Sequence, residues 1–220
     1  SFNCVYCQYG WTEVRAAPPD ARWPRVDEVV SAVRAAAART TSAGTTVDRW
    51  TLAGHGEPTL HPQFPAVVEA LCGLRSQIAP DTPIGVLSNS TTAHLPEIRR
   101  ALGRLDERGM KLDAGTQDEL RHVNAAATPI GQIVEALAAL PDIAVQAMFV
   151  REPGGRVDNA SQRAVAAWLE AIARIRPRDV QIYTLARQPA WAQLEPVPPA
   201  RLHEIAADVR ALGLRATVFL

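Results

Sequence analysis

The sequence predicts an α/β fold built from parallel strands, and the order and spacing of its elements support this prediction. Short apolar, β-prone stretches alternate along the chain with segments whose apolar residues repeat at helical spacing. Strands and helices that alternate in this way are typical of parallel βα units. A doubly wound sheet and a βα barrel both satisfy the pattern, so periodicity alone leaves these two architectures open.

Six stretches are predicted as strands because they are short, apolar and β-prone. They cover residues 47–53, 84–88, 110–113, 143–150, 180–185 and 215–220. The chain opens with a loop, and its first regular element is a helix, whereas a parallel βα fold should begin with a strand. We therefore expect a further strand upstream of Ser1.

Helices are predicted between these strands from the spacing of their apolar residues. Val26, Val29, Val30 and Val33 follow the i, i+3, i+4, i+7 pattern of one helix face. The same reasoning places further helices at residues 64–78, 95–105, around 133–137, 165–172 and 202–212, the last ending near Gly213. The proline-rich segments 17–24 and 189–199 are expected to be ordered loops, since they connect neighbouring elements.

The composition is that of a single globular domain, which we place at residues 1–220. Hydrophobic residues make up 47% of the chain and charged residues 21%, a mixture that excludes intrinsic disorder. Lys and Arg (23) balance Asp and Glu (23), and 23 − 23 = 0 excludes a surface that is basic throughout. No apolar run approaches the ~20 residues of a membrane span, and no signal peptide opens the chain. Three cysteines, an odd number, argue against a secreted disulfide scaffold, so we expect a cytoplasmic protein.

A C-x-x-C sequence, Cys4-Val5-Tyr6-Cys7, precedes the first helix and is compatible with four interpretations. A zinc site would need a second Cys or His pair, and His55 and His61 are poorly spaced for one. A thioredoxin-like redox pair would place its second cysteine at the start of a helix. The remaining interpretations are two structurally unremarkable cysteines and an iron–sulfur cluster, which would need at least one more ligand. Cys72 lies on an apolar helical stripe, and this position favours a small buried hydrophobic residue over a cluster ligand.

The second motif is Gly54-His55-Gly56-Glu57-Pro58-Thr59-Leu60-His61-Pro62, at the carboxyl end of a predicted strand. In parallel βα folds this end carries the active site. The motif is not a dinucleotide-binding fingerprint, because Thr59 replaces the third glycine. Gly54 and Gly56 would allow a ligand close to the backbone. Glu57 is placed to accept hydrogen bonds from an ammonium group, or else is a turn-forming surface residue.

Together these motifs resemble those of radical S-adenosylmethionine (radical SAM) enzymes. The first ten residues resemble their cluster-binding loop, C-x-x-x-C-x-x-C, with its first cysteine immediately before Ser1. Residues 54–62 resemble the second-strand motif that binds the amino group of S-adenosylmethionine. Less specific motif matches follow at Leu87-Ser88-Asn89-Ser90, Lys111-Leu112-Asp113-Ala114-Gly115, Arg121-His122-Val123-Asn124 and Gln181-Ile182-Tyr183-Thr184. The series covers nearly the whole chain and is similar to generic Fe–S oxidoreductases and to the related wyosine-type tRNA-modifying enzymes.

The resemblance implies a partial (β/α)6 TIM-like barrel whose first strand lies upstream of Ser1. It implies that Cys4, Cys7 and an upstream cysteine are the catalytic metal ligands of a [4Fe–4S] cluster. An electron passed through the cluster would cleave S-adenosylmethionine to a 5′-deoxyadenosyl radical, which abstracts hydrogen from a substrate. The cofactors supply this chemistry, and the protein supplies positioning, electrostatics and exclusion of water. No further cysteine cluster is present for a second iron–sulfur centre.

The resemblance also implies a set of cofactor-binding residues: Tyr6, Gly56, Glu57, Ser88, Asn89, Lys111 and Asp113. Each has a structural alternative. Tyr6 could be a packing aromatic, and Ser88 and Asn89 could cap a helix. Lys111 and Asp113 are two positions apart on a predicted strand, so they share a face and would either pair with each other or hold the cofactor.

Substrate-side residues are less sharply indicated. Arg151, Tyr183 and Arg187 lie at or just beyond predicted strand ends, Met148 suits either an adenine contact or the core, and His55 and His61 suit substrate contact or turn packing. An electron donor of the flavodoxin or ferredoxin type is expected as a partner. Neutral net charge favours a small-molecule or peptide substrate over RNA, although Arg99, Arg100 and Arg104 could form a local basic patch. The alternatives are a degenerate, non-catalytic βα-barrel domain and a tRNA-base-modifying radical enzyme.

Overall fold

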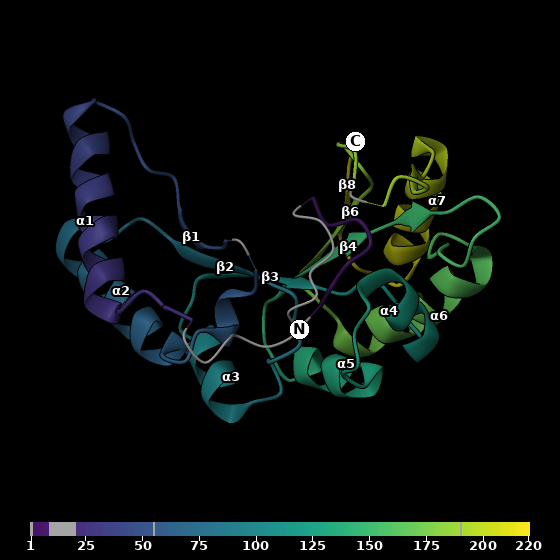
Figure 1. Ribbon diagram of the computed structural model, residues 1–220, viewed down its shortest axis with the longest axis horizontal. Coiled ribbons are helices and arrows are strands. Elements are labelled where there is room, and N and C mark those ends of the chain that lie inside the picture. Colours follow the sequence, from purple (N-terminus) through teal and green to yellow (C-terminus); the bar gives the residue numbers. More distant parts are fainter. Residues whose placement is uncertain (1, 9–20, 55, 190) are drawn as a thin grey trace.

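A computed structural model of the chain describes residues 2–8, 21–54, 56–189 and 191–220. Its centre is a sheet of six strands in the order β1-β2-β3-β4-β6-β8 (Figure 1). These strands are β1 (Trp50–Leu52), β2 (Ile84–Ser88), β3 (Glu107–Lys111), β4 (Ala144–Met148), β6 (Asp179–Tyr183) and β8 (Ala216–Phe219). A two-stranded antiparallel ribbon, β5 (Val150–Arg151) with β7 (Glu195–Pro196), lies beyond the end of β4.

The strand order decides between the two architectures left open by periodicity. Every neighbouring pair in the six-stranded sheet is parallel, and the strands follow one another in chain order. A doubly wound sheet reverses its order at a switch point, and this sheet does not. Helices α1 to α7 flank the outer side of the curved sheet (Figure 1). The predicted partial TIM-like barrel is therefore confirmed, and the further strand expected upstream of Ser1 stays a prediction.

Apart from α4, the helices follow the predicted apolar stripes, and capping residues and prolines mark several of their ends. They are α1 (Val26–Ser42), α2 (Phe64–Ile78), α3 (Pro96–Leu102), α4 (Gln117–Asn124), α5 (Ile130–Ala138), α6 (Gln162–Ile175) and α7 (Pro199–Ala211), with a short 3-10 helix, η1, at Pro58–Leu60. Proline occupies the first turn of α2, α3 and α7, where a missing N–H costs nothing. Ser161 caps α6 by accepting the N–H of Ala164.

Alternation along the strands separates a buried layer from the inner face of the partial barrel. Met110, Val145 and Ile182 point toward the helices and are fully buried. Trp168 of α6 closes this layer, and its Nε1 donates to the carbonyl of Leu112 over 2.9 Å. The intervening residues Lys111, Gln146 and Gln181 are paired in register across β3, β4 and β6 and are only partly buried. The inner face is therefore polar at its centre, where Gln146 Nε2 donates to Gln181 Oε1 over 2.8 Å.

The bounds of β1, β6 and β8 differ from their predicted ranges by one to three residues at an end, and two other strands differ more. The third strand covers Glu107–Lys111 rather than 110–113, because Arg108, although charged, is buried and donates to the carbonyl of Leu105 over 2.7 Å. The predicted strand 143–150 divides after Met148, where Val150 leaves the main sheet and pairs with Pro196 of β7. The proline-rich segment 189–199 thus contributes a strand of its own.

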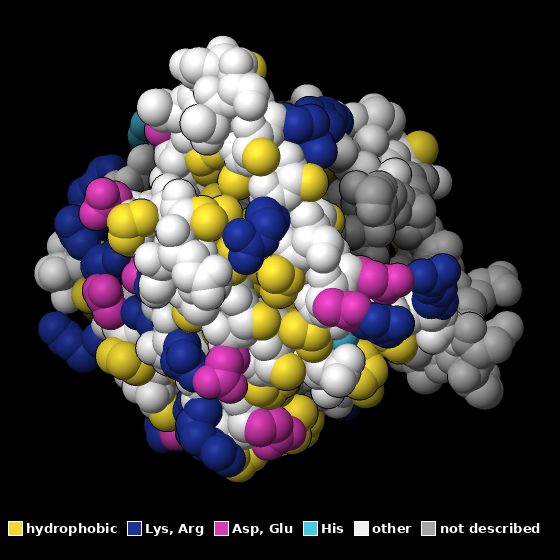
Figure 2. Space-filling model, turned by 90° about the vertical axis from the view of Figure 1, so that its left-hand side faces the viewer, with side chains coloured by type: hydrophobic (Ala, Val, Ile, Leu, Met, Phe, Trp, Pro, Cys, Tyr) yellow, Lys and Arg dark blue, Asp and Glu magenta, His cyan; other side chains and the backbone are white. Residues whose placement is uncertain are grey.

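The face that carries α1 and α2 mixes charges of both signs. Basic and acidic side chains are interspersed there and form no patch of a single sign (Figure 2). This distribution agrees with the zero net charge of the sequence. Within the described residues, none of the helices has the length and apolar character needed to cross a membrane.

Candidate functional site

The cysteine loop is fastened to the carboxyl end of α4 by backbone hydrogen bonds. The N–H of Asn3 donates to the carbonyl of Asn124 over 2.8 Å, and the N–H of Val5 donates to that of Val123 over 3.0 Å. A third bond, from the N–H of Cys7 to the carbonyl of Cys4 over 3.0 Å, folds the C-x-x-C into a turn. Contacts of Tyr6 with Asp113 and of Cys4 with Asn124 place this turn close to the carboxyl end of β3.

Beside Cys4 lies a buried group of three polar side chains: Tyr6, Asp113 and Asn124. Asn124 Nδ2 donates to Asp113 Oδ2 over 2.7 Å, and lies 3.2 Å from both Cys4 Sγ and the Tyr6 hydroxyl. Tyr6 in turn donates its hydroxyl hydrogen to Asp113 Oδ2. Burial, reinforced by the charge of Asp113, raises the pKa of Tyr6 well above its ordinary value. Tyr6 therefore remains a hydrogen-bond donor at neutral pH.

Asp113 also compensates the charge of Lys111, the only lysine in the sequence. Lys111 Nζ lies 3.4 Å from Asp113 Oδ1, which accepts the N–H of Met148 over 2.8 Å as well. The same ammonium donates to the Tyr183 hydroxyl over 2.7 Å and lies about 5 Å from the ring centroids of Tyr6 and Tyr183. Burial acts to lower the pKa of Lys111, but Asp113 and Tyr183 outweigh it and raise that pKa above its ordinary value. Lys111 is a fixed cation, and the predicted ion pair with Asp113 is present.

Glu57 joins the loop after β1 to the end of β2. Its Oε1 accepts from Thr59 N–H, Thr59 Oγ1 and Ser88 Oγ at 3.1, 2.6 and 2.8 Å. Its Oε2 accepts the N–H of Asn89. Glu57 is only 8% exposed, so it is a buried organising carboxylate and not the surface turn residue of the structural alternative. Among the described residues Oε2 has one donor, which leaves it lone-pair capacity for a cation.

The neighbouring predicted residues shape the same edge of the sheet. Gly56 has φ +125°, a conformation that residues with a Cβ rarely adopt, and this supports a glycine requirement at that position. Asn89 Oδ1 accepts from Thr91 N–H and Oγ1 at 3.1 and 2.7 Å, so Asn89 caps the turn after β2. Ser90 Oγ donates to the carbonyl of Lys111 over 2.8 Å. The turn after β2 is thereby joined to β3 and to the group around Asp113.

Cys4 and Cys7 have the donor atoms and the position expected of ligands to an iron–sulfur cluster. Both are free and partly buried, and soft thiolates at the active-site edge of a parallel sheet suit iron. Burial, with Asp113 adding to it, raises the pKa of the Cys4 thiol to about 11, so metal binding there releases a proton. No group of three metal-ligating side chains occurs among the described residues. A cluster at Cys4 and Cys7 would therefore need a further ligand from outside that set.

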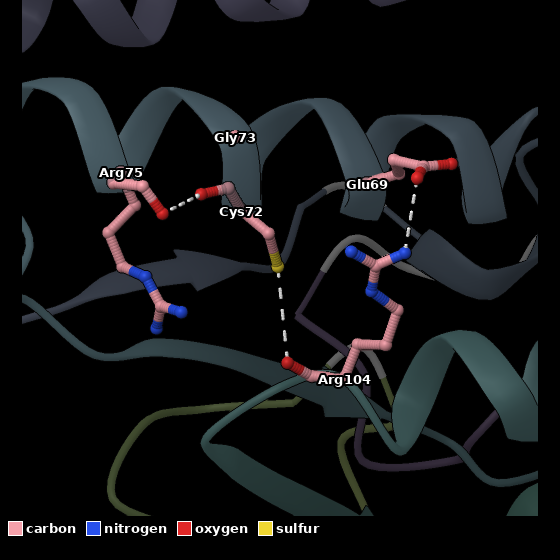
Figure 3. A pocket seen from close by; sticks show the side chains of 6 residues that line it. Glu69, Cys72, Gly73, Arg75 and Arg104 are labelled. Carbon is pink, nitrogen blue, oxygen red and sulfur yellow. Dashed lines mark hydrogen bonds and ion pairs between the residues drawn. The ribbon is translucent and has the colours of Figure 1, made fainter.

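Cys72 is not this third ligand. It projects from α2 toward the carbonyl of Arg104, 3.9 Å from its Sγ, in the outer layer of the fold (Figure 3). The cavity there is lined by Glu69, Cys72, Gly73, Arg75, Ser76 and Arg104. Cys72 is partly buried against the main hydrophobic core, in agreement with its interpretation as a small core residue.

The predicted substrate-side residues are dispersed. Arg151 pairs with Glu195 over 2.8 Å between β5 and β7, and Arg187 reaches Gln8 Oε1 over 3.5 Å. His61 accepts the N–H of Gln63 and contacts the carbonyl of Pro24, so it organises a turn. Met148 packs against a small apolar cluster around Val150, and His55 lies outside the described residues.

Two asparagines of the site were not predicted as functional residues. Asn124 contacts Cys4, and Asn159 donates to the backbone carbonyls of Asp113 and Met148 over 2.8 Å each. Asn124 ends a helix that the apolar periodicity missed. Its start carries a readable signal, because Thr116 and Glu119 form a capping box. No comparable local signal marks Asn159.

Comparison with known proteins identifies the family to which this chain belongs. The family model of the Radical SAM superfamily matches residues 1–180, which is most of the chain. The chain belongs to the radical SAM superfamily. Members of this superfamily generally use a [4Fe–4S] cluster and S-adenosylmethionine, and the motifs around Cys4 and Glu57 lie inside the matched region.

Individual proteins similar to this chain come from both sequence and structure comparisons. A UPF0026 protein of Synechocystis is 27% identical over 203 residues, covering 89% of this chain and 69% of that protein. A radical SAM methyltransferase from Sphaerobacter thermophilus superposes with a TM-score of 0.74 at 19% identity, covering 100% of this chain. TYW1 with a lysine-pyruvate adduct bound superposes with a TM-score of 0.66 at 13% identity, covering 96% of this chain and 69% of that one. The chain spans only 62% of the methyltransferase chain, and both structural likenesses concern the fold.

Proposed function

We propose that this chain binds a [4Fe–4S] cluster through Cys4, Cys7 and a third cysteine, and cleaves S-adenosylmethionine reductively. The bound cofactors would supply a 5′-deoxyadenosyl radical that abstracts a hydrogen atom from the substrate. One observation carries the proposal: direct contacts join the cysteine loop to Glu57. Tyr6 donates a hydrogen bond to Asp113, and Asp113 forms an ion pair with Lys111. The backbone carbonyl of Lys111 accepts a hydrogen bond from Ser90 in the turn after β2. At the end of β2, Ser88 donates to Glu57.

The residues of this network have separable tasks. Cys4 and Cys7 hold iron, and their turn is fixed by the end of α4. Glu57 Oε2 accepts a hydrogen bond from the ammonium group of S-adenosylmethionine, while Glu57 Oε1 keeps its hydrogen bonds from Thr59 and Ser88. Lys111 offers a permanent positive charge to a carboxylate or a ribose oxygen at the carboxyl end of β3. Asp113 and Tyr183 keep that ammonium in place.

A small molecule or a peptide is the proposed substrate class. The inner face of the sheet presents the neutral amides of Gln146 and Gln181 beside Lys111, which suits a substrate rich in hydrogen-bonding groups. The viewed outer face mixes charges of both signs, in contrast to the basic surface that RNA binding favours. One structural neighbour, SuiB of Streptococcus suis, has been solved bound to a precursor peptide. The electron would come from a flavodoxin- or ferredoxin-like partner.

Anaerobic reconstitution of the full-length protein with iron and sulfide tests this function. We expect about four irons per chain, an EPR signal of the reduced cluster that changes on addition of S-adenosylmethionine, and release of 5′-deoxyadenosine under reductant. C4A and C7A should each abolish the signal and the release, because two remaining ligands hold a cluster poorly.

C72A is the matched control, since it removes a thiol from the outer layer and leaves the cysteine loop untouched. It should retain wild-type iron content and wild-type release of 5′-deoxyadenosine. A full-length protein that binds no cluster, or whose signal ignores S-adenosylmethionine, would identify the chain as a non-catalytic member of the fold. Dependence of product formation on added tRNA would instead favour the tRNA-modifying alternative.

A further inference from the structure

Asn124 is fully buried at the end of α4 and holds Cys4 in two independent ways. Its backbone carbonyl accepts the N–H of Asn3, immediately before Cys4, and its side-chain Nδ2 lies 3.2 Å from Cys4 Sγ. On the other side of Cys4, Val5 is bonded to Val123. The sulfur, the residue before it and the residue after it are therefore all held by the last two residues of one helix.

The orientation of the Asn124 amide is fixed by its surroundings. Asp113 Oδ2 lies 2.7 Å from Nδ2, and a carboxylate requires a donor at that distance. With one amide hydrogen directed at Asp113, the second faces Cys4 Sγ and the Tyr6 oxygen. Asn124 Oδ1 is buried and, among the described residues, has no hydrogen-bond partner. Leaving a buried acceptor without a hydrogen bond costs free energy. The hydrogen bonds that Nδ2 donates must therefore stabilise this orientation by more than that cost.

We infer that Asn124 is a positioning residue that donates an N–H···S hydrogen bond to the Cys4 thiolate when a cluster is bound, and thereby raises the cluster's reduction potential. This inference rests on the proposed function. Reduction adds one electron to the cluster and its sulfur ligands, so a donor aimed at a ligand sulfur stabilises the reduced form more than the oxidised form. Because the amide is buried and held by Asp113, it cannot turn away toward solvent.

The test compares N124A with the wild type, both reconstituted anaerobically and titrated by EPR. We expect N124A to retain about four irons per chain, while the equilibrium constant for one-electron reduction falls about tenfold, a lowering of 59 mV. T116A is the control for general loosening. Thr116 caps the start of α4 by accepting the N–H of Glu119, so its loss weakens the same helix and leaves the Asn124 amide in place. It should leave the potential unchanged.

A second measurement needs no variant. Reduced wild-type protein carrying ¹⁵N in its asparagine side chains should show a ¹⁵N coupling to the cluster in pulsed EPR, because an N–H···S bond transfers spin density. Absence of this coupling, or an N124A potential equal to that of the wild type, overturns the inference. A shift of the same size in T116A overturns it as well, since general loosening of α4 would then explain both. In these cases cluster binding and cleavage of S-adenosylmethionine still stand, whereas a wild-type protein without a cluster removes the proposed function itself.

Discussion

Replacement of Asp113 by alanine should destabilise the fold by about 3 kcal/mol or more, the cost of breaking a buried ion pair from one side. The Asp113 side chain is fully buried, and it receives hydrogen bonds from Tyr6, Asn124 and the N–H of Met148. D113A leaves these donors unpaired and leaves the Lys111 ammonium without its counter-charge. Urea unfolding of the metal-free protein, followed by circular dichroism, measures the change in the free energy of unfolding.

Two further variants separate the sources of this effect. K111M should cost less than D113A, because the carboxylate keeps its three neutral donors when the ammonium is removed. D118A removes an aspartate whose side chain is 81% exposed and, among the described residues, pairs only with Arg121 of the same helix. Its cost should be below about 1 kcal/mol. Equal effects of D113A and D118A would contradict the assignment of Asp113 as the organising group.

Replacement of Gly115 by alanine should also be severe, with a cost of about 3 kcal/mol. A Cβ at this position would lie 2.2 Å from the carbonyl carbon of Ala167 and from the nitrogen of Trp168, both in the backbone of α6. Backbone atoms within a helix cannot move aside singly, so α6 would have to shift away from the sheet. That shift would strain the hydrogen bond from Trp168 to Leu112. The transition midpoint in urea reports the loss.

Gly73 supplies the control for this substitution. It lies within α2, and a Cβ there would meet no atom within 4 Å. G73A should therefore stabilise the protein by about 0.5–1 kcal/mol, through the higher helix propensity of alanine. A destabilising G73A, or a neutral G115A, would show that the two glycines are not distinguished by the space around them.

The elements that periodicity predicted well are those whose burial follows a regular pattern. The helix at Phe64–Ile78 and the strand at Ile84–Ser88 have the bounds expected from the sequence, because continuous apolar stripes pack against the core. Prediction was poorer at β3, where the buried Arg108 donates to the carbonyls of Leu102 and Leu105 and pairs with Asp142. It failed for α4, whose helical signal is a polar capping box and few apolar residues.

The site was predictable to the extent that local motifs encode it. The C-x-x-C and the G-E-P sequence each identified a short segment. The spacing of Lys111 and Asp113 predicted that they pair with each other or hold the cofactor, and their ion pair is present. The network that joins these segments depends on Asn124 and Asn159, whose partners are distant in sequence. A single asparagine in a sequence has no pattern that reveals such partners. Tertiary packing alone brings them to Asp113.

The fastening of the cysteine loop to α4 has a consequence for how metal is acquired. Cys4 and Asn124 are 120 positions apart, and closing a chain segment of this length costs configurational entropy. The bonds of Asn3 and Val5 to α4 provide contacts within the polypeptide that offset this cost. Iron of the proposed cluster would then enter a preorganised turn, and its binding free energy would not be consumed in ordering the loop. The amide hydrogens of Asn3 and Val5 should accordingly exchange slowly with deuterium in the metal-free protein.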